Sequence, residues 1–225
     1  MSWTFSQMFG DSSLSGDDLF DEDTLTCLEF NEDGDMFAVG DQAGRVSVYQ
    51  QSIDSYASLV QFQSHEPEFD FLKSEEIPES INALQFLKRQ SESVFVLSAN
   101  GWFLEFFLSQ SLDKTIKLWK IKQKRMASVS DSMDLSRLSI PSVEFSDWIY
   151  STSCRQVYFS AHEFPISSLS LNTDNETFIS SDYFRINLWN FNAPQECFSN
   201  HSGESEPTQV IRYCTAQDRE FENIK

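Results

Sequence analysis

The stretch "LSLNTDNETFISSDYFRINLWN" (residues 169–190) decides the fold. A turn-forming "NTDNE" is followed by a small-residue run that leads into Asp182, and an alternating run, "RINLWN", then closes on Trp189. Alternation of apolar and polar residues with period two, between turn residues, indicates β-strands. An aspartate just before the last strand suits a tight turn, because its side chain can accept backbone N–H groups.

Two further stretches repeat this pattern, "LEFNEDGDMFAVGDQAGRVSVYQ" (28–50) and "LSANGWFLEFFLSQSLDKTIKLWK" (97–120). The closing aromatics are spaced 70 residues apart, at Tyr49, Trp119 and Trp189. An aspartate precedes the last strand in every copy, at Asp41, Asp113 and Asp182. Such repeats are typical of β-propeller blades, in which we expect the closing aromatic to pack between neighbours. The spacing exceeds the ~40–45 residues of a WD repeat, which predicts long loops between the blades.

The composition predicts a packed domain outside any membrane. Apolar residues make up 40% of the 225 and aromatic residues 14%, enough for a core. The longest apolar run, "GWFLEFFL" (101–108), contains Glu105 and is too short for a membrane span, and the N-terminus lacks a secretory signal. The four cysteines are far apart, which favours free thiols in a reducing compartment. We expect a cytoplasmic location and leave a nuclear one open as well.

The acidic charge is concentrated in the first third of the chain. The net charge is −19, and residues 1–80 contain 18 acidic side chains against Arg45 and Lys73 alone. An acidic surface attracts basic peptides and repels phosphate backbones, so nucleic acid is disfavoured as a partner. A surface that is acidic merely for solubility remains the alternative.

Motifs for catalysis are absent. His65, His162 and His201 have no zinc-binding spacing and no nearby nucleophile pattern, and no glycine-rich phosphate loop occurs. We therefore expect no enzymatic activity, no cofactor and no metal site. For His162, we favour a structural hydrogen bond to the aspartate or a hydroxyl of its own blade over contact with a ligand.

Several motifs together resemble one family, the WD-repeat regulatory B subunits of protein phosphatase 2A. The most specific matches are "FQSHEPEFDFLKS" (62–74), "DKTIKLWKI" (113–121), "FRINLWN" (184–190) and "GDQAGRVSVYQ" (40–50). The resemblance implies an all-β, seven-bladed propeller without catalytic activity. Such a subunit docks on the phosphatase scaffold subunit and selects basic phosphoproteins for the catalytic subunit.

This chain departs from the family pattern in length and in one blade. We expect about three of the seven blades over residues 1–213, including a β-hairpin arm at about 122–158, and a divergent tail at 214–225. Residues 101–112, "GWFLEFFLSQSL", interrupt the second repeat and resemble an unspliced intron or a lineage-specific insertion. At the rim of the third repeat, Asp182-Tyr183 stands where the family has an acidic pair, which predicts altered substrate selectivity.

The resemblance also implies two sets of binding residues. The substrate groove is expected to use Phe69, Lys73, Glu76, Glu79, Phe164, Asp182 and Tyr183. Contact with the scaffold subunit is expected from the arm residues Arg137, Leu138, Ile140, Pro141, Val143 and Phe145. For the loop at 63–80, the alternative is that Phe69, Phe71 and Lys73 simply pack beneath it.

Two other functions stay open at this point. One is a generic WD-repeat scaffold for protein interactions, unconnected with the phosphatase. The other is a truncated or mis-spliced product with no function. The basic cluster from Lys114 to Arg125 does not support nucleic-acid binding, because on a strand its side chains need not share one face.

Overall fold

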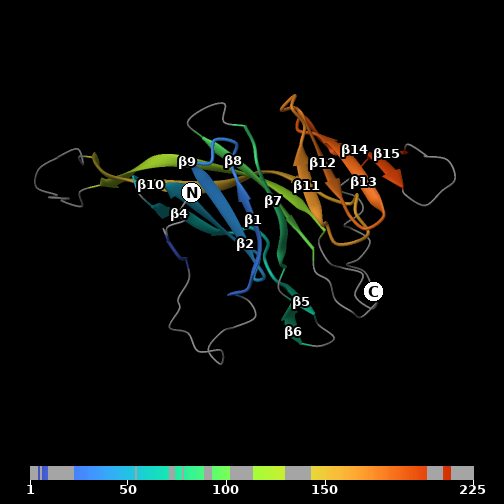
Figure 1. Cartoon of the computed structure of the whole chain (residues 1–225), viewed down its shortest axis with the longest axis horizontal. Coiled ribbons are helices and arrows are strands. Elements are labelled where there is room, and N and C mark those ends of the chain that lie inside the picture. Colours follow the sequence, from blue (N-terminus) through green and yellow to red (C-terminus); the bar gives the residue numbers. More distant parts are fainter. Residues whose placement is uncertain are drawn as a thin grey trace, which may run out of the picture.

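The computed structural model describes part of the chain, and all statements on structure refer to that part: residues 5, 7–9, 23–53, 55–70, 74–77, 79–88, 93–101, 114–129, 143–201 and 210–213. These residues form antiparallel sheets (Figure 1). In that part of the chain, no helix is long and apolar enough to cross a membrane.

Three sheets follow one another along the chain, and we call them blades 1 to 3. Blade 1 consists of β1 (Leu25–Phe30), β2 (Met36–Asp41), β3 (Arg45–Gln51) and β4 (Tyr56–Gln63). Blade 2 consists of β7 (Ile81–Phe86), β8 (Val94–Asn100), β9 (Ile116–Val129) and β10 (Val143–Tyr158). Blade 3 consists of β11 (Ser168–Leu171), β12 (Thr177–Ser181), β13 (Arg185–Asn190), β14 (Ala193–His201) and β15 (Val210–Tyr213). A small hairpin, β5 (Glu68–Asp70) and β6 (Glu75–Ile77), lies between blades 1 and 2 in sequence.

The predicted partial propeller is confirmed as an all-β fold of consecutive antiparallel sheets. Within each blade the strands pair in chain order, so each blade is a meander. Blades 1 and 2 have four strands each, whereas blade 3 has a fifth, β15, which pairs with β14. Strand β15 has only four residues, "VIRY", which is too short for the sequence pattern alone to predict a strand there.

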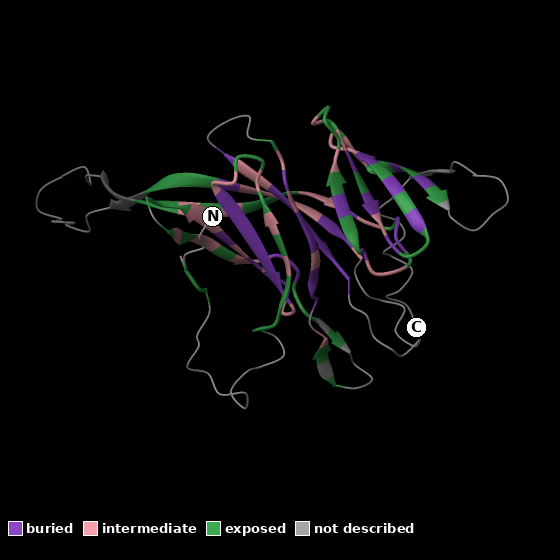
Figure 2. Ribbon diagram, in the orientation of Figure 1, coloured by how far each residue is buried: buried purple, intermediate pink, exposed green. Residues whose placement is uncertain are grey.

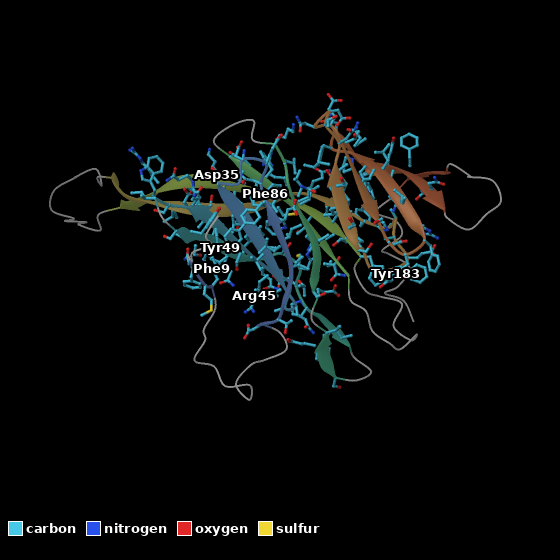
Figure 3. All side chains as sticks on the ribbon, viewed as in Figure 1. Phe9, Asp35, Arg45, Tyr49, Phe86 and Tyr183 are labelled. Atoms are coloured by element: carbon cyan, nitrogen blue, oxygen red, sulfur yellow. The ribbon has the colours of Figure 1, made fainter. Side chains whose placement is uncertain are left out.

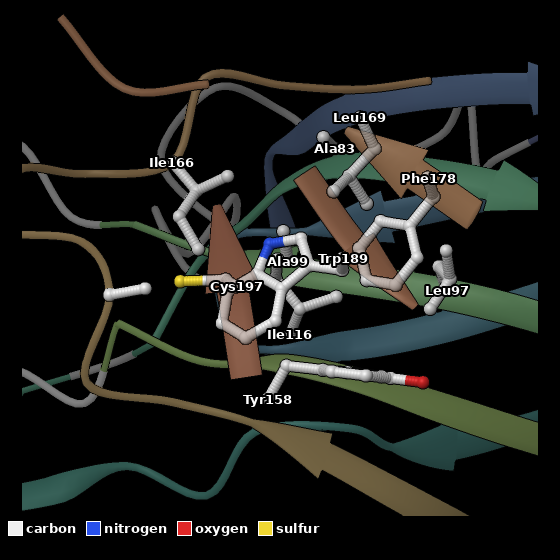
Figure 4. Close-up of a cluster of buried hydrophobic side chains, with 11 residues drawn as sticks. Ala83, Leu97, Ala99, Ile116, Tyr158, Ile166, Leu169, Phe178, Trp189 and Cys197 are labelled. Carbon is white, nitrogen blue, oxygen red and sulfur yellow. The ribbon is translucent and has the colours of Figure 1, made fainter. Parts of the chain in front are cut away.

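Apolar cores fill the spaces between blades. One cluster joins blades 1 and 2 and includes Val46, Val48, Val96 and Ile121. The other joins blades 2 and 3 around Trp189, which is 1% exposed (Figure 4). The ring of Trp189 lies edge-on to Tyr158, with centroids 5.4 Å apart.

The expectation that closing aromatics pack between blades holds for two of three repeats. Trp189 does so, and Trp119 packs on Phe62 of blade 1 with ring centroids 4.7 Å apart. Tyr49 instead stacks on Phe37 of its own blade. Among the described residues, no sheet precedes blade 1 against which Tyr49 could pack.

The inner strands of the three blades lie side by side. Strand β7 contacts both β1 and β11. Side-chain hydrogen bonds connect these strands. From β1, Cys27 Sγ donates to the carbonyl of Ile81 in β7 at 3.3 Å. From β7, Asn82 Nδ2 donates to the carbonyl of Ile166, just before β11, at 3.3 Å. Gly40 permits the close approach, because a Cβ there would lie 2.7 Å from Ile81.

Strands β9 and β10 extend far beyond the rest of blade 2. They pair from Ile116 and Tyr158 to Val129 and Val143, whereas pairing of β9 with β8 ends at Ile121. Beyond Ile121 the two strands continue as a ribbon, at the left of Figure 1. This ribbon lies in the segment where the β-hairpin arm was expected, at about 122–158, and we call residues 122–129 and 143–151 the arm.

Candidate functional site

The loops that carry the predicted substrate residues meet at one end of the blades, which we call the turn end. The backbone N–H groups of Ser64 and His65 donate to the carbonyl of Gly44 in the β2–β3 turn. Similarly, Gly101 donates to the carbonyl of Ser80 at 3.2 Å. Figures 1 and 3 show the β5–β6 hairpin, Arg45 and Tyr183 on the same, lower side of the molecule.

The β5–β6 hairpin brings two predicted residues together. Phe69 and Glu76 are directly paired across the two strands, so their side chains lie on the same face. Phe69 is 44% exposed and Glu76 is exposed. Ser74, in the turn, has a φ of 56° in the left-handed region. Lys73 lies outside the described residues.

Glu79, which was expected in the substrate groove, is a buried residue of the turn end. It is 2% exposed, and its Oε2 accepts a hydrogen bond from Asn100 Nδ2. The Oδ1 of Asn100 in turn accepts the backbone N–H of Thr115 at 2.8 Å. Glu79 therefore orients Asn100, which closes the turn of blade 2. The sequence analysis assigned this turn to Asp113, which lies outside the described residues.

Asp182 is also buried by its own blade, at 8% exposed, and its expected contact with substrate stays a prediction. Its Oδ1 accepts the backbone N–H groups of Phe184 and Arg185 at 2.8 and 2.7 Å, and its Oδ2 lies 2.9 Å from His162 Nδ1. Burial alone would raise the pKa of Asp182, but these hydrogen bonds outweigh it and lower the pKa below its usual value.

The same network continues to the closing tryptophan of blade 3. His162 Nε2 lies 2.6 Å from Ser180 Oγ, and Trp189 Nε1 donates to Ser180 Oγ at 2.8 Å. If Ser180 donates to His162, the donors run in one direction from Trp189 to Asp182, with the histidine proton on Nδ1. The structural role expected for His162 is confirmed.

An aromatic cluster forms the exposed rim of blade 3, and we call it the aromatic rim: Phe164, Tyr183 and Phe184. Phe164 lies edge-on to both neighbours, with centroids 4.9 Å from Phe184 and 6.5 Å from Tyr183. Tyr183 is 57% exposed and Phe184 55% exposed. The sequence pattern did not single out Phe184, although a large apolar residue two positions after a turn aspartate is a usable signal.

Basic side chains at the turn end are already engaged. Arg45 pairs with Asp41 and Asp23 at 2.6 Å each, and these carboxylates raise its pKa. Arg185 pairs with Glu163, and Lys114 donates to the Glu163 carbonyl. Glu66, beside the hairpin, and Glu76, on it, are exposed and form no ion pair with another described residue.

The arm carries a basic face that the sequence analysis did not expect. Lys122 and Lys124 are two residues apart on the regular strand β9, so they share one face, in line with Lys120. Arg125 lies over the ring of Trp148, 4.5 Å from its centroid. Trp148 is 54% exposed and marks an apolar contact point that the sequence analysis missed.

The predicted scaffold-binding residues fall near the end of this arm. Val143 and Phe145 begin β10 and pair with Val129 and Ala127. The other four residues assigned to scaffold contact lie outside the described residues: Arg137, Leu138, Ile140 and Pro141.

The comparisons with known proteins agree with this architecture. Residues 152–190 match the model of the WD domain, G-beta repeat. The chain is 37% identical, over 94% of its length, to the serine/threonine-protein phosphatase 2A regulatory subunit sur-6 of Caenorhabditis elegans. It is 38% identical over 88% to the B-type regulatory subunit of protein phosphatase PP2A of Schizosaccharomyces pombe, and 36% identical over 93% to the PP2A 55 kDa regulatory subunit of Drosophila melanogaster.

The alignments cover nearly all of this chain but only 45%, 44% and 44% of those three relatives. The likeness therefore extends through all three blades and is not confined to the generic repeat at 152–190. The chain is homologous over nearly its whole length to the protein phosphatase 2A regulatory B subunits, and it spans slightly less than half the length of the curated relatives that it matches.

Proposed function

We propose that this chain is a non-catalytic regulatory module of protein phosphatase 2A. In this proposal the arm docks on the scaffold subunit, and the turn end receives basic phosphoprotein substrates for the catalytic subunit. The observation that carries it is the 37% identity, over 94% of the chain, to a phosphatase 2A regulatory subunit. We place this activity in the cytoplasm and leave a nuclear location open.

The arm supports the docking part of the proposal by its shape and charge. It projects beyond the four-stranded part of blade 2, so a partner can reach both of its faces (Figure 1). Exposed lysines on one face suit acidic side chains, and Trp148 with Arg125 offers an apolar and cationic contact.

The turn end supports the substrate part by combining exposed rings with exposed carboxylates. Phe69 and Glu76 share one face of the hairpin, and Tyr183 and Phe184 extend from blade 3. Carboxylates attract basic peptides over a distance, whereas aromatic rings provide the contact area that holds them. With Glu79 and Asp182 buried, Glu76 is the one carboxylate of the predicted substrate set that stays exposed.

Binding to the purified scaffold–catalytic heterodimer tests the docking step. We expect the 225-residue chain to bind it in biolayer interferometry, and Lys122→Glu combined with Lys124→Glu to weaken binding at least tenfold. Lys88→Glu is the matched control, because Lys88 is a partly exposed lysine outside the arm, paired with Glu32. No binding by the unmodified chain would overturn the proposal and favour a generic WD-repeat scaffold or a non-functional fragment; equal losses in arm and control variants would overturn the role of the arm.

A further inference from the structure

One edge of the arm has no neighbouring strand. Strand β9 pairs with β10 on one side as far as Val129, but its pairing with β8 on the other side ends at Ile121. Within the part of the chain that the structure describes, no strand pairs with this other side of β9 from Lys122 to Val129. Its outward-pointing backbone N–H and C=O groups can therefore accept a further strand. We call this side of residues 122–129 the free edge.

The free edge is regular, whereas the opposite edge, formed by β10, is not. The pairing of β9 with β10 shifts twice, between Phe145 and Trp148 and between Cys154 and Gln156, and each time the extra residue lies in β10. Such β-bulges twist an edge and hinder the addition of a further strand. The sequence of the free edge, "KQKRMASV", contains neither proline nor glycine. Of the two edges, that of β9 therefore keeps the evenly spaced backbone groups that strand addition requires.

The charges along the free edge are all positive. Its sequence contains Lys122, Lys124 and Arg125 and no acidic residue. The residues from Lys122 to Arg125 are exposed (Figure 2). Lys122 and Lys124 share one face of the strand, and Arg125 lies on the other face, over the ring of Trp148.

These charges select which strand can be added. Like charges directly opposite each other on neighbouring strands are destabilising, whereas opposite charges are stabilising. Lysines on an edge strand therefore oppose pairing with the same edge of a second copy, which is a common protection against aggregation. The same lysines favour a strand that carries acidic side chains at alternate positions, because these lie on one face.

We propose that the free edge binds an extended acidic segment of a partner protein by strand addition, so that the segment becomes a third strand of the arm. Main-chain hydrogen bonds to β9 hold the segment, and its acidic side chains pair with Lys122 and Lys124. This goes beyond the docking step proposed above, because it concerns the backbone at one edge of the arm and not the faces of the arm.

Binding of a synthetic peptide to the purified 225-residue chain tests strand addition. The probe alternates glutamate and threonine over about eight residues, the length of the free edge, so that its carboxylates lie on one face. Isothermal titration calorimetry should show that it binds. The same peptide with a methyl group on every backbone nitrogen keeps its charges but donates no main-chain hydrogen bond, so its affinity should be weaker by about tenfold or more. Equal affinities, or no binding of the unmethylated peptide, would overturn the proposal.

Amide hydrogen exchange, followed by nuclear magnetic resonance, locates the added strand. Along a strand the backbone N–H groups point alternately to its two sides, and in β9 every second one points to β10. The peptide should therefore slow exchange at every second residue between Lys122 and Val129 and leave the residues between them unchanged. Protection that does not alternate, or that falls on β10 instead, would also overturn the proposal.

Charge variants test the choice of an acidic partner. Lys122→Glu combined with Lys124→Glu should abolish binding of the acidic peptide, and a peptide with lysine in place of glutamate should bind this double variant instead. Lys88→Glu is the matched control, because Lys88 is a partly exposed lysine outside the arm. Far-ultraviolet circular dichroism confirms that each variant folds. If the double variant binds the acidic peptide as tightly as the unmodified chain does, the free edge does not select acidic segments and the proposal is wrong.

Discussion

Blades 2 and 3 close the same turn with different chemistry. In blade 3 the network is local: Asp182, His162 and Ser180 connect the turn to Trp189 with every ring nitrogen of His162 engaged. In blade 2, Asn100 replaces the aspartate and depends on Glu79, which lies 21 residues earlier in the chain.

The histidine differs as well. His65 occupies the position of His162, but the preceding residue is Ser64 where blade 3 has Ala161. Trp119 Nε1 donates to Ser64 Oγ at 2.8 Å, and Ser64 Oγ lies 2.7 Å from Ser98 Oγ. In blade 3 the tryptophan donates directly to Ser180, whereas in blade 2 Ser64 lies between the tryptophan and Ser98. His65 remains 2% exposed, with no hydrogen-bond partner of good geometry for its ring nitrogens among the described residues.

The blade architecture therefore tolerates a change of hydrogen-bond partner as long as the turn N–H and the tryptophan N–H each keep an acceptor. Both N–H groups need an acceptor because a buried polar group without a hydrogen-bond partner destabilises the folded state. The two blades should therefore respond differently to the same type of substitution.

The largest effect is expected for Asp182→Ala. The change removes the acceptor of two backbone N–H groups and of His162, so the free energy of unfolding should fall by about 3 kcal/mol. Urea denaturation followed by tryptophan fluorescence measures this. Asp174→Ala is the matched control, because Asp174 accepts the backbone N–H groups of Glu176 and Thr177 in the same way at a fully exposed turn. Equal losses of unfolding free energy in the two variants would show that the burial of Asp182 does not increase its contribution to stability.

In blade 2, Asn100→Asp should lower the free energy of unfolding by about 2 kcal/mol, although aspartate is the residue at this position in blades 1 and 3. The introduced carboxylate could still accept from Thr115 but could not donate to Glu79, and it would place two carboxylates together. Adding Glu79→Gln should restore most of the loss, because a glutamine amide can donate back. A double-mutant cycle without such recovery would show that the two side chains are not coupled.

The sequence was sufficient for the parts of the fold that depend on neighbouring residues. Asp41 and Asp182 were recognisable because an aspartate accepts N–H groups two to four residues later. Asn100 was missed because its partner, Thr115, lies beyond the insert. Glu79 was expected in the substrate groove because nothing in its acidic loop indicates that blade 2 begins directly after it, with β7 at Ile81. Its burial depends on a contact with Asn100, which no local pattern reveals.

A smaller effect is expected for His65→Leu. Burial, with the charge of Lys117, lowers the pKa of His65 to about 3, and the backbone of Thr115 opposes this only in part. The folded chain thus keeps His65 neutral while the unfolded chain binds a proton below about pH 6.5. The unmodified chain should lose stability as the pH falls from about 6.5 toward 3, and His65→Leu should lose less.

Urea midpoints at pH 7.5 and pH 5 measure this difference. At pH 7.5, His65→Leu should change the free energy of unfolding by less than about 1 kcal/mol, because no ring hydrogen bond is lost. His162→Leu is the comparison and should cost more, since it breaks the network of blade 3. An unchanged pH dependence in His65→Leu would exclude this histidine as a source of acid sensitivity.

The smallest effects on stability, and the most direct test of the turn end, are expected for Phe69→Ala and Tyr183→Ala. Both side chains are largely exposed, so each change should alter the free energy of unfolding by less than about 0.5 kcal/mol. If the turn end binds substrates, each should weaken the affinity for a basic phosphopeptide by about 1–2 kcal/mol, which fluorescence anisotropy can measure.

Charge at the same site should act on a different quantity. Glu76→Lys should slow association and reduce its dependence on salt, because exposed rim carboxylates mainly steer encounters. Glu176→Lys is the matched control, since Glu176 is an exposed acid in the β11–β12 turn, at the opposite end of blade 3. Peptide binding that responds equally to both charge reversals would show that net charge alone attracts the peptide. A response confined to Glu76, together with the losses in Phe69→Ala and Tyr183→Ala, would locate the peptide between the hairpin and the aromatic rim.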